Sequence, residues 1–150
     1  MDGDKAYILG RVVCSELGIN EEVLFCIDTG AGGTALFVDD AIRIGVDIRK
    51  LRRCKNYTRG IGGMADGCFL PNAEVKFLSD EGITLIIPFS ELPIFLLSES
   101  KLKRVIAFFR TRFLRKKRRR LVLPSLLGFD FLYACSISFC EKKAHLDLKQ

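Results

Sequence analysis

An apolar run that ends at one carboxylate and then enters a glycine-rich loop is the feature that most constrains this chain. Residues 25–37 read FCIDTGAGGTALF, so a strand-like run stops at Asp28, and a threonine and three glycines follow within five residues. Glycine lets the backbone turn where a side chain would clash. The pattern predicts a buried strand, a tight loop that holds Asp28, and a further strand over 34–38.

Short apolar runs with turn residues between them make up most of the remaining sequence, which predicts an all-β, or mostly β, fold. Residues 56–70, NYTRGIGGMADGCFL, predict a hairpin with a mobile glycine tip. A short helix is expected at 38–45 and another directly after Gly128, so a strand, a glycine loop and a helix occur twice. Further strands are expected at 5–13, 21–27, 73–78, 83–89, 135–140 and 144–148.

Length and composition fit one domain over residues 1–150, because 49% of the residues are hydrophobic, enough for a packed core. The six cysteines contain no C-x-x-C pair and have one histidine, His145, beside them, which argues against a zinc site. The N-terminal segment does not resemble a signal peptide, and no uncharged run approaches the roughly 18 residues that span a bilayer. We expect a reduced, cytoplasmic protein with mostly buried thiols, with a disulfide framework as the alternative.

One segment carries the excess positive charge. Residues 101–120 hold eleven Lys and Arg and no acid, so the net charge of +6 for the whole chain leaves −5 for the rest. Apolar residues recur there at three- and four-residue steps, which predicts an amphipathic helix with a basic face. Such a face can bind an acidic partner, nucleic acid or an anionic membrane surface to which the protein is peripheral, or it can simply be solvated.

Two interpretations of Asp28 follow from the residues alone. A turn aspartate bonds its own backbone and stabilises the loop. A catalytic aspartate needs a second carboxylate, because two adjacent carboxylates share one proton and so supply an acid and a base at one site. Thr29 adds a hydroxyl that can donate and accept hydrogen bonds, and the small Ala31 leaves space for a substrate to approach.

Three segments occur in an order that bears on this choice: DTGA at 28–31, GIGG at 60–63 and LLGFDFL at 126–132. Together they resemble the retropepsin-like aspartic proteases, the family of the retroviral protease, over most of residues 5–148. The resemblance implies a closed acid-protease β-barrel with a short C-terminal helix, here with an extra basic helix inserted at about 95–122. It also implies a homodimer in which each subunit brings one aspartate, and a peptide or protein substrate, with no metal or cofactor.

The resemblance implies a role for each segment, with Asp28 as the catalytic carboxylate. Support for the active-site loop would come from Thr29, Gly30 and Ala31. The flap that closes over the substrate would consist of Gly60, Ile61, Gly62 and Gly63. The segment packed beneath the loop would be Leu126, Leu127 and Gly128. One Asp28 would take a proton from the water that attacks the peptide carbonyl, while its protonated mate hydrogen-bonds the carbonyl oxygen.

The chain departs from that family beside the active-site loop. Retroviral members usually pair an aspartate soon after DTGA with an arginine after LLG, whereas Gly32, Gly33 and Phe129 stand at these places here. Both charges are absent together, so no lone charge is buried. Asp130 can therefore pair with a different residue.

Three functions compete on these grounds. The first is an aspartic endopeptidase, which the intact DTGA and the glycine hairpin favour. The second is an interaction or regulatory module that keeps the retropepsin fold and binds through the basic segment. The third is a basic nucleic-acid-binding protein in which the Asp28 loop is structural. The sequence does not identify a substrate.

Overall fold

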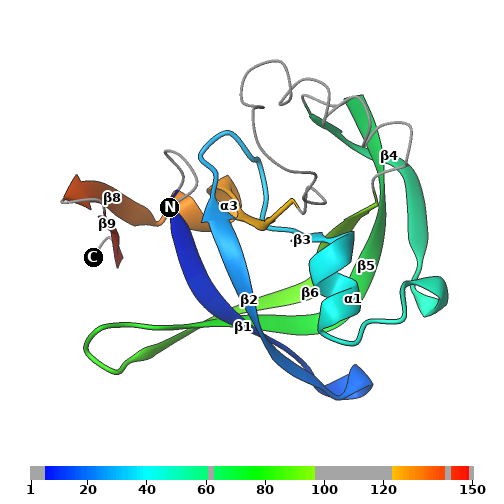
Figure 1. The fold of residues 1–150 in the computed structure, drawn as a ribbon, viewed down its shortest axis with the longest axis horizontal. Helices are drawn as coiled ribbons and strands as arrows, with labels where there is room; N and C mark the ends of the chain where they lie inside the picture. The colour runs from blue at the N-terminus through cyan, green and yellow to red at the C-terminus, as the bar shows by residue number, and fades with distance from the viewer. Residues whose placement is uncertain (1–5, 61–62, 97–122, 141–142, 149–150) are drawn as a thin grey trace, which may run out of the picture.

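The computed structural model describes residues 6–60, 63–96, 123–140 and 143–148, and the fold is mostly β, as predicted (Figure 1). The strands are β1 Tyr7–Cys14, β2 Ile19–Ile27, β3 Leu36–Phe37, β4 Arg53–Gly60, β5 Gly63–Leu78, β6 Thr84–Leu96, β7 Ser125–Leu127, β8 Cys135–Cys140 and β9 Lys143–Leu148. The helices are α1 Val38–Arg43 and α3 Phe129–Leu132, with single 3-10 turns at η1 Ser15–Leu17 and η2 Ile48–Lys50. Both predicted short helices, at 38–45 and after Gly128, are thus confirmed.

The strands form two sheets within these ranges. The larger has seven strands in the order β3-β6-β5-β1-β2-β7, with β4 paired to β5 outside this path, and the smaller pairs β8 with β9. Most neighbours are antiparallel, but β7 lies parallel to β2 and β3 lies parallel to β6. In Figure 1 the long β5 and β6 strands cross β1 and β2 at a steep angle.

The expectation of a closed barrel is wrong. The larger sheet ends at β3 on one side and at β7 on the other. Across this gap, an isolated bridge joins Ala35 to Leu126, with N–O distances of 3.0 and 2.8 Å. Because β3 spans two residues and β7 three, they are too short to continue the pairing, and the sheet stays open.

The strand predicted at 73–78 is the second half of a longer element. β5 runs for 16 residues and pairs with β4 and β1 on one side and with β6 on the other. In the sequence, Pro71 and Asn72 are residues typical of a turn, and they suggest that the strand is interrupted there. Asn72 instead takes a positive φ of 43°, which asparagine tolerates, and the pairing with β6 continues on both sides of it.

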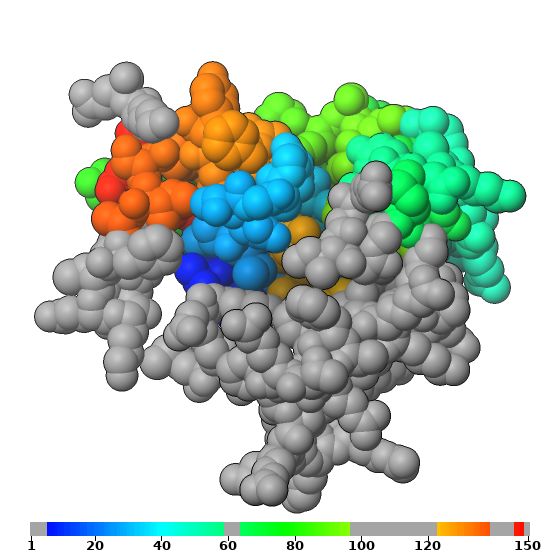
Figure 2. Space-filling model, turned by 90° about the horizontal axis from the view of Figure 1, so that it is seen from above, coloured from blue at the N-terminus to red at the C-terminus, as the bar shows by residue number. Residues whose placement is uncertain are grey.

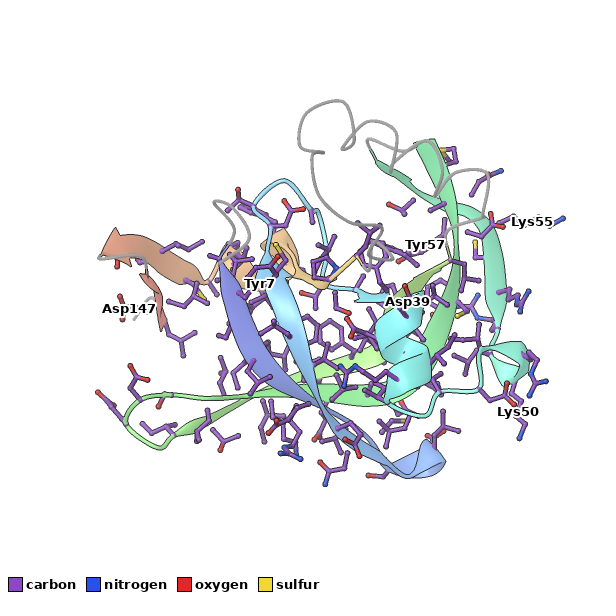
Figure 3. All side chains as sticks on the ribbon, in the orientation of Figure 1. Tyr7, Asp39, Lys50, Lys55, Tyr57 and Asp147 are labelled. Atoms are coloured by element: carbon purple, nitrogen blue, oxygen red, sulfur yellow. The ribbon has the colours of Figure 1, made fainter. Side chains whose placement is uncertain are left out.

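Alternation of buried and exposed residues along the strands builds the core. On β2, Val23 and Phe25 are completely buried, whereas Leu24 between them is exposed. Burial of an aliphatic or phenyl side chain contributes about 1.5–3 kcal/mol. Figure 3 shows carbon-rich side chains filling the interior, while the labelled Lys50 and Lys55 lie at the periphery.

Most of the cysteines whose side chains the structure describes are buried. The buried ones are Cys14, Cys26, Cys68 and Cys135, and the half-buried one is Cys54. Burial raises the pKa of the Cys68 thiol, because desolvation disfavours the thiolate, and the nearby Arg53 opposes this only in part. Cys68 therefore stays protonated at neutral pH and is a poor nucleophile.

The basic helix predicted at about 95–122 lies almost wholly outside the described residues. Phe95 and Leu96 are the last two residues of β6, and the helix itself stays a prediction. Among the helices that the structure describes, none has the length and apolar character needed to cross a bilayer.

Candidate active site

Asp28 directly follows β2 and begins a tight loop. The backbone of β7 holds this loop in place. The Asp28 N–H donates to the carbonyl oxygen of Leu127 at 3.1 Å. The loop is closed by the Ala31 N–H, which donates to the Asp28 carbonyl oxygen, also at 3.1 Å. Asp28 is half-buried, whereas Thr29 and Gly30 are exposed. The loop therefore has a fixed base and presents its tip to solvent.

One carboxylate oxygen of Asp28 is engaged in its own loop. The Gly30 N–H donates to Oδ1 at 2.9 Å, which is the contact expected of a turn aspartate. Within the part of the chain that the structure describes, Oδ2 accepts no hydrogen bond. The loop thus orients the side chain and leaves one oxygen uncommitted, an arrangement compatible with both interpretations of Asp28.

The segment Leu126, Leu127 and Gly128 lies directly against this loop. Leu127 pairs with Ile27 in the parallel β2–β7 ladder. At Gly128, an added Cβ would lie 2.3 Å from the carbonyl carbon of Gly33 and 2.4 Å from its carbonyl oxygen. The two chain segments therefore meet backbone to backbone, and only glycine fits at position 128. The structure brings the DTGA and LLG segments together.

Asp130 has a partner in the same loop. Its carboxylate accepts hydrogen bonds from the Thr34 N–H at 2.9 Å and from the Thr34 hydroxyl at 2.8 Å. The Thr34 hydroxyl oxygen in turn accepts from the Gly128 N–H at 3.1 Å. Thr34 is buried, and hydrogen bonds to a charged acceptor are stronger than neutral ones. This network ties α3 to the end of the loop that leads into β3.

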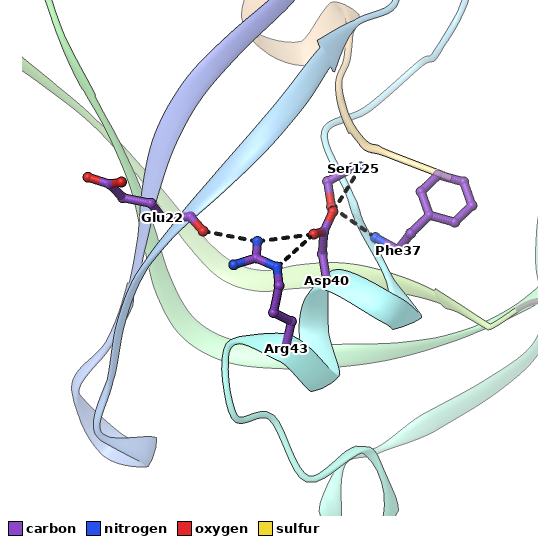
Figure 4. A network of polar contacts seen from close by, with 5 residues as sticks. All are labelled: Glu22, Phe37, Asp40, Arg43 and Ser125. Carbon is purple, nitrogen blue, oxygen red and sulfur yellow. Dashed lines mark hydrogen bonds and ion pairs between the residues drawn. The ribbon is translucent and has the colours of Figure 1, made fainter. Parts of the chain in front are cut away.

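A second polar network, which the sequence did not reveal, holds α1 against β7 and β2 (Figure 4). Asp40 Oδ2 accepts from the Ser125 N–H at 3.2 Å and from the Ser125 hydroxyl at 2.8 Å. Arg43 donates to Asp40 Oδ1 at 3.1 Å and to the Glu22 carbonyl oxygen at 3.0 Å. The Ser125 hydroxyl oxygen accepts from the Phe37 N–H at 3.1 Å. This network fixes α1 to β2, which leads into the Asp28 loop, and to β7, which supports that loop.

Removal of the Ser125 hydroxyl is expected to lower the free energy of unfolding by about 1–3 kcal/mol. Ser125 is completely buried, so Ser125→Ala takes a partner from the Phe37 N–H and from the half-buried Asp40, and the new methyl group cannot replace it. Urea denaturation measures the change, with Ser136→Ala on an exposed position of β8 as the control. Equal stabilities of the two variants would contradict this role.

The glycine hairpin is present as β4 and β5, but its tip is outside the described residues. Gly60 lies opposite Gly63 at the end of the ladder, and the structure does not describe Ile61 and Gly62. In Figure 1 the end of this hairpin and the Asp28 loop both lie toward the top of the view. The flap role stays a prediction.

Other candidate residues do not gather into a site. Among the described side chains, no three His, Cys, Asp or Glu residues form a group that could hold a metal ion. His145 pairs through its backbone with Ser138 on β8, and its side chain is outside the description. Cys26 lies on β2 two residues before Asp28 and is buried.

Comparisons with family models and with curated proteins find no match. Among solved structures, the chain is similar to a retropepsin-like aspartic protease from Rickettsia conorii, with 20% sequence identity and a TM-score of 0.47. The similarity covers 97% of this chain and 82% of that protein. An identity and a TM-score this low assign no function to the chain.

Proposed function

We propose that this chain is an aspartic endopeptidase that works as a homodimer, with Asp28 of each subunit as the catalytic carboxylate. The observation that carries the proposal is the setting of Asp28. Its loop is fixed by the Leu127 carbonyl and its side chain is oriented by the Gly30 N–H, while no residue that the structure describes donates to Oδ2. A carboxylate that moves protons needs such a fixed geometry and an oxygen within reach of water or substrate.

The homodimer follows from the number of aspartate loops. Asp-Thr-Gly occurs once in the sequence, and one carboxylate cannot act as an acid and a base at the same time. Thr29 and Gly30 at the loop tip are exposed, so two loops can meet across a two-fold axis without a change of fold. Dimers with this symmetry are by far the commonest oligomers.

In the dimer, an ionised Asp28 accepts a proton from a water molecule, whose oxygen attacks the peptide carbonyl carbon. The protonated Asp28 of the other subunit hydrogen-bonds the carbonyl oxygen, and a proton then passes to the amide nitrogen as the C–N bond breaks. The mechanism needs one ionised and one protonated Asp28, so the rate is expected to follow a bell-shaped pH profile. The β4–β5 tip closes over the substrate and excludes water.

A non-catalytic module is the second candidate, and one contact favours it. The bond from the Gly30 N–H to Asp28 is what a purely structural loop requires. In either case, the eleven positive charges at 101–120 give the chain a means of binding an acidic protein, nucleic acid or an anionic membrane.

Digestion of a peptide library at acidic and neutral pH, over a dilution series of the protein, tests the endopeptidase proposal. Activity per chain is expected to fall as the protein is diluted below the dissociation constant of its dimer, because only the dimer holds two carboxylates. Sedimentation velocity on the same samples gives the fraction of dimer. Full activity in a strictly monomeric sample would rule out the shared site, and no cleavage under any condition would favour the non-catalytic module.

A further inference from the structure

An exposed aromatic pair lies on the surface beside the Asp28 loop. Phe129 is 55% exposed and Tyr133 is 64% exposed, and their ring centroids are 6.4 Å apart. Figure 2 shows the residues around Asp28, in blue, at the surface, with the orange segment that includes α3 beside them. Exposed apolar patches mark contact sites, and the cores of protein interfaces are enriched in aromatic side chains.

The pair is fixed to the loop through the backbone. The Phe129 N–H donates to the Ala31 carbonyl oxygen at 2.7 Å, and the Tyr133 N–H donates to the Phe129 carbonyl oxygen at 3.0 Å. Directly before α3, Gly128 packs on Gly33 without space for a methyl group. The aromatic pair and the aspartate loop therefore keep a constant position relative to each other.

The acid between the two aromatic residues, Asp130, is exposed, but its carboxylate is bonded to the loop. The carboxylate of Asp130 accepts from the N–H and the hydroxyl of Thr34 and from the Phe131 N–H. The loop therefore meets part of the hydrogen-bonding capacity of this carboxylate. Since charged groups are depleted from the cores of interfaces and found at their rims, Asp130 suits the rim of a contact whose core is the aromatic pair.

We infer that Phe129 and Tyr133 form an apolar contact between two copies of this chain, beside their paired Asp28 loops. The inference rests on the homodimer of the proposed function. The occupant is a second copy because the site is incomplete without one. A two-fold axis that brings two Asp28 carboxylates together also brings both aromatic pairs to the edge of the same contact, because Phe129 is one hydrogen bond away from the loop residue Ala31. Buried aromatic anchors then supply affinity that two small loops lack.

A double variant, Phe129→Ser with Tyr133→Ser, tests the contact. The substitutions leave in place the backbone groups that make the Phe129–Ala31 and Tyr133–Phe129 hydrogen bonds, and they remove two exposed rings. Sedimentation equilibrium is expected to show a dimer dissociation constant raised by at least about tenfold, as truncation of interface anchors does. The matched control is Leu78→Ser, because Leu78 is 73% exposed at the end of β5, on a hairpin that Figure 1 places away from the Asp28 loop. The control is expected to dimerise like the wild type.

Cleavage at saturating protein concentration separates this inference from the protease proposal. If the double variant has a raised dissociation constant and unchanged cleavage per dimer, the result supports both the contact and the protease proposal. A raised constant with no cleavage by the wild type or the variant supports the contact and removes the protease proposal. If the dimer dissociation constant of the double variant equals that of Leu78→Ser, the contact is overturned. If the KM of the double variant is raised while its dissociation constant is not, the pair binds substrate instead. A wild-type chain that is monomeric at every concentration also overturns the contact. If the double variant does not fold, as judged by circular dichroism, Tyr133→Ser alone answers the question.

Discussion

Asparagine in place of Asp28 is expected to abolish peptide cleavage while the fold is retained. The amide oxygen of asparagine can still accept the Gly30 N–H, the 2.9 Å bond that orients the loop. The amide cannot ionise, however, and so cannot take a proton from water. Loss of a positioned acid or base costs about 10²–10⁴-fold in rate, and this substitution removes it from both subunits. Peptide turnover at a measured dimer fraction gives the result.

The stability of the same variant separates catalysis from loop structure. Two carboxylates at one site repel each other unless they share a proton, so Asp28→Asn is expected to leave the dimer at least as stable as the wild type at neutral pH. Asp147→Asn, on an exposed position of β9, is the matched control and is expected to cleave like the wild type. If Asp28→Asn still cleaves peptides, the protease proposal fails and Asp28 is a turn residue.

Gly128→Ala is expected to be the most destabilising substitution beside the Asp28 loop. The new Cβ would lie 2.3, 2.4 and 2.8 Å from the carbonyl carbon, carbonyl oxygen and Cα of Gly33. These are backbone atoms, which cannot rotate aside as a side chain can. We expect the free energy of unfolding to fall by about 3 kcal/mol or more, a large share of the roughly 5–15 kcal/mol that holds a domain folded. Urea denaturation measures this loss.

Neighbouring glycines supply controls for the same chemical change. A Cβ at Gly33 would meet Asp130 Oδ2 at 3.6 Å, an ordinary contact, and a Cβ at Gly32 would have nothing within 4 Å. Gly33→Ala and Gly32→Ala are therefore expected to keep most of the stability, although Gly33 is the partner of Gly128 in the close contact. Equal denaturation midpoints for Gly128→Ala and Gly33→Ala would show that the backbones do not approach so closely in solution.

Features that depend on neighbouring residues were predictable from the sequence. The alternation that buries Val23 and Phe25 and the glycines that follow Asp28 act over a few positions, so β2 and its loop are visible in the residue order. The end of α1 is also local, since Gly45 after it takes a φ of 92° that favours glycine. β5 was divided wrongly because Pro71 and Asn72 have the composition of a turn, while the pairing with β6 decides the outcome.

Contacts between distant segments could not be predicted in this way. The bond between Asp40 and Ser125 spans 85 positions, and that between Thr34 and Asp130 spans 96. Each of these residues alone suits an ordinary helix, turn or strand. The open sheet has a similar cause, because closure depends on the lengths of β3 and β7, and sequence patterns define strand ends only to within a few residues.

The parallel pairing of β2 with β7 places Phe25 opposite Ser125, and this has a consequence for the order in which the chain folds. Contacts between such remote positions form slowly, because a long loop must close first. During synthesis, β1 and β2 can pair as soon as both have emerged from the ribosome. The Asp28 amide has to wait for the Leu127 carbonyl, which is made about a hundred residues later. A nascent chain therefore holds its aspartate before it holds the scaffold that aims it, and the Asp28 loop takes its final geometry only after β7 has been made.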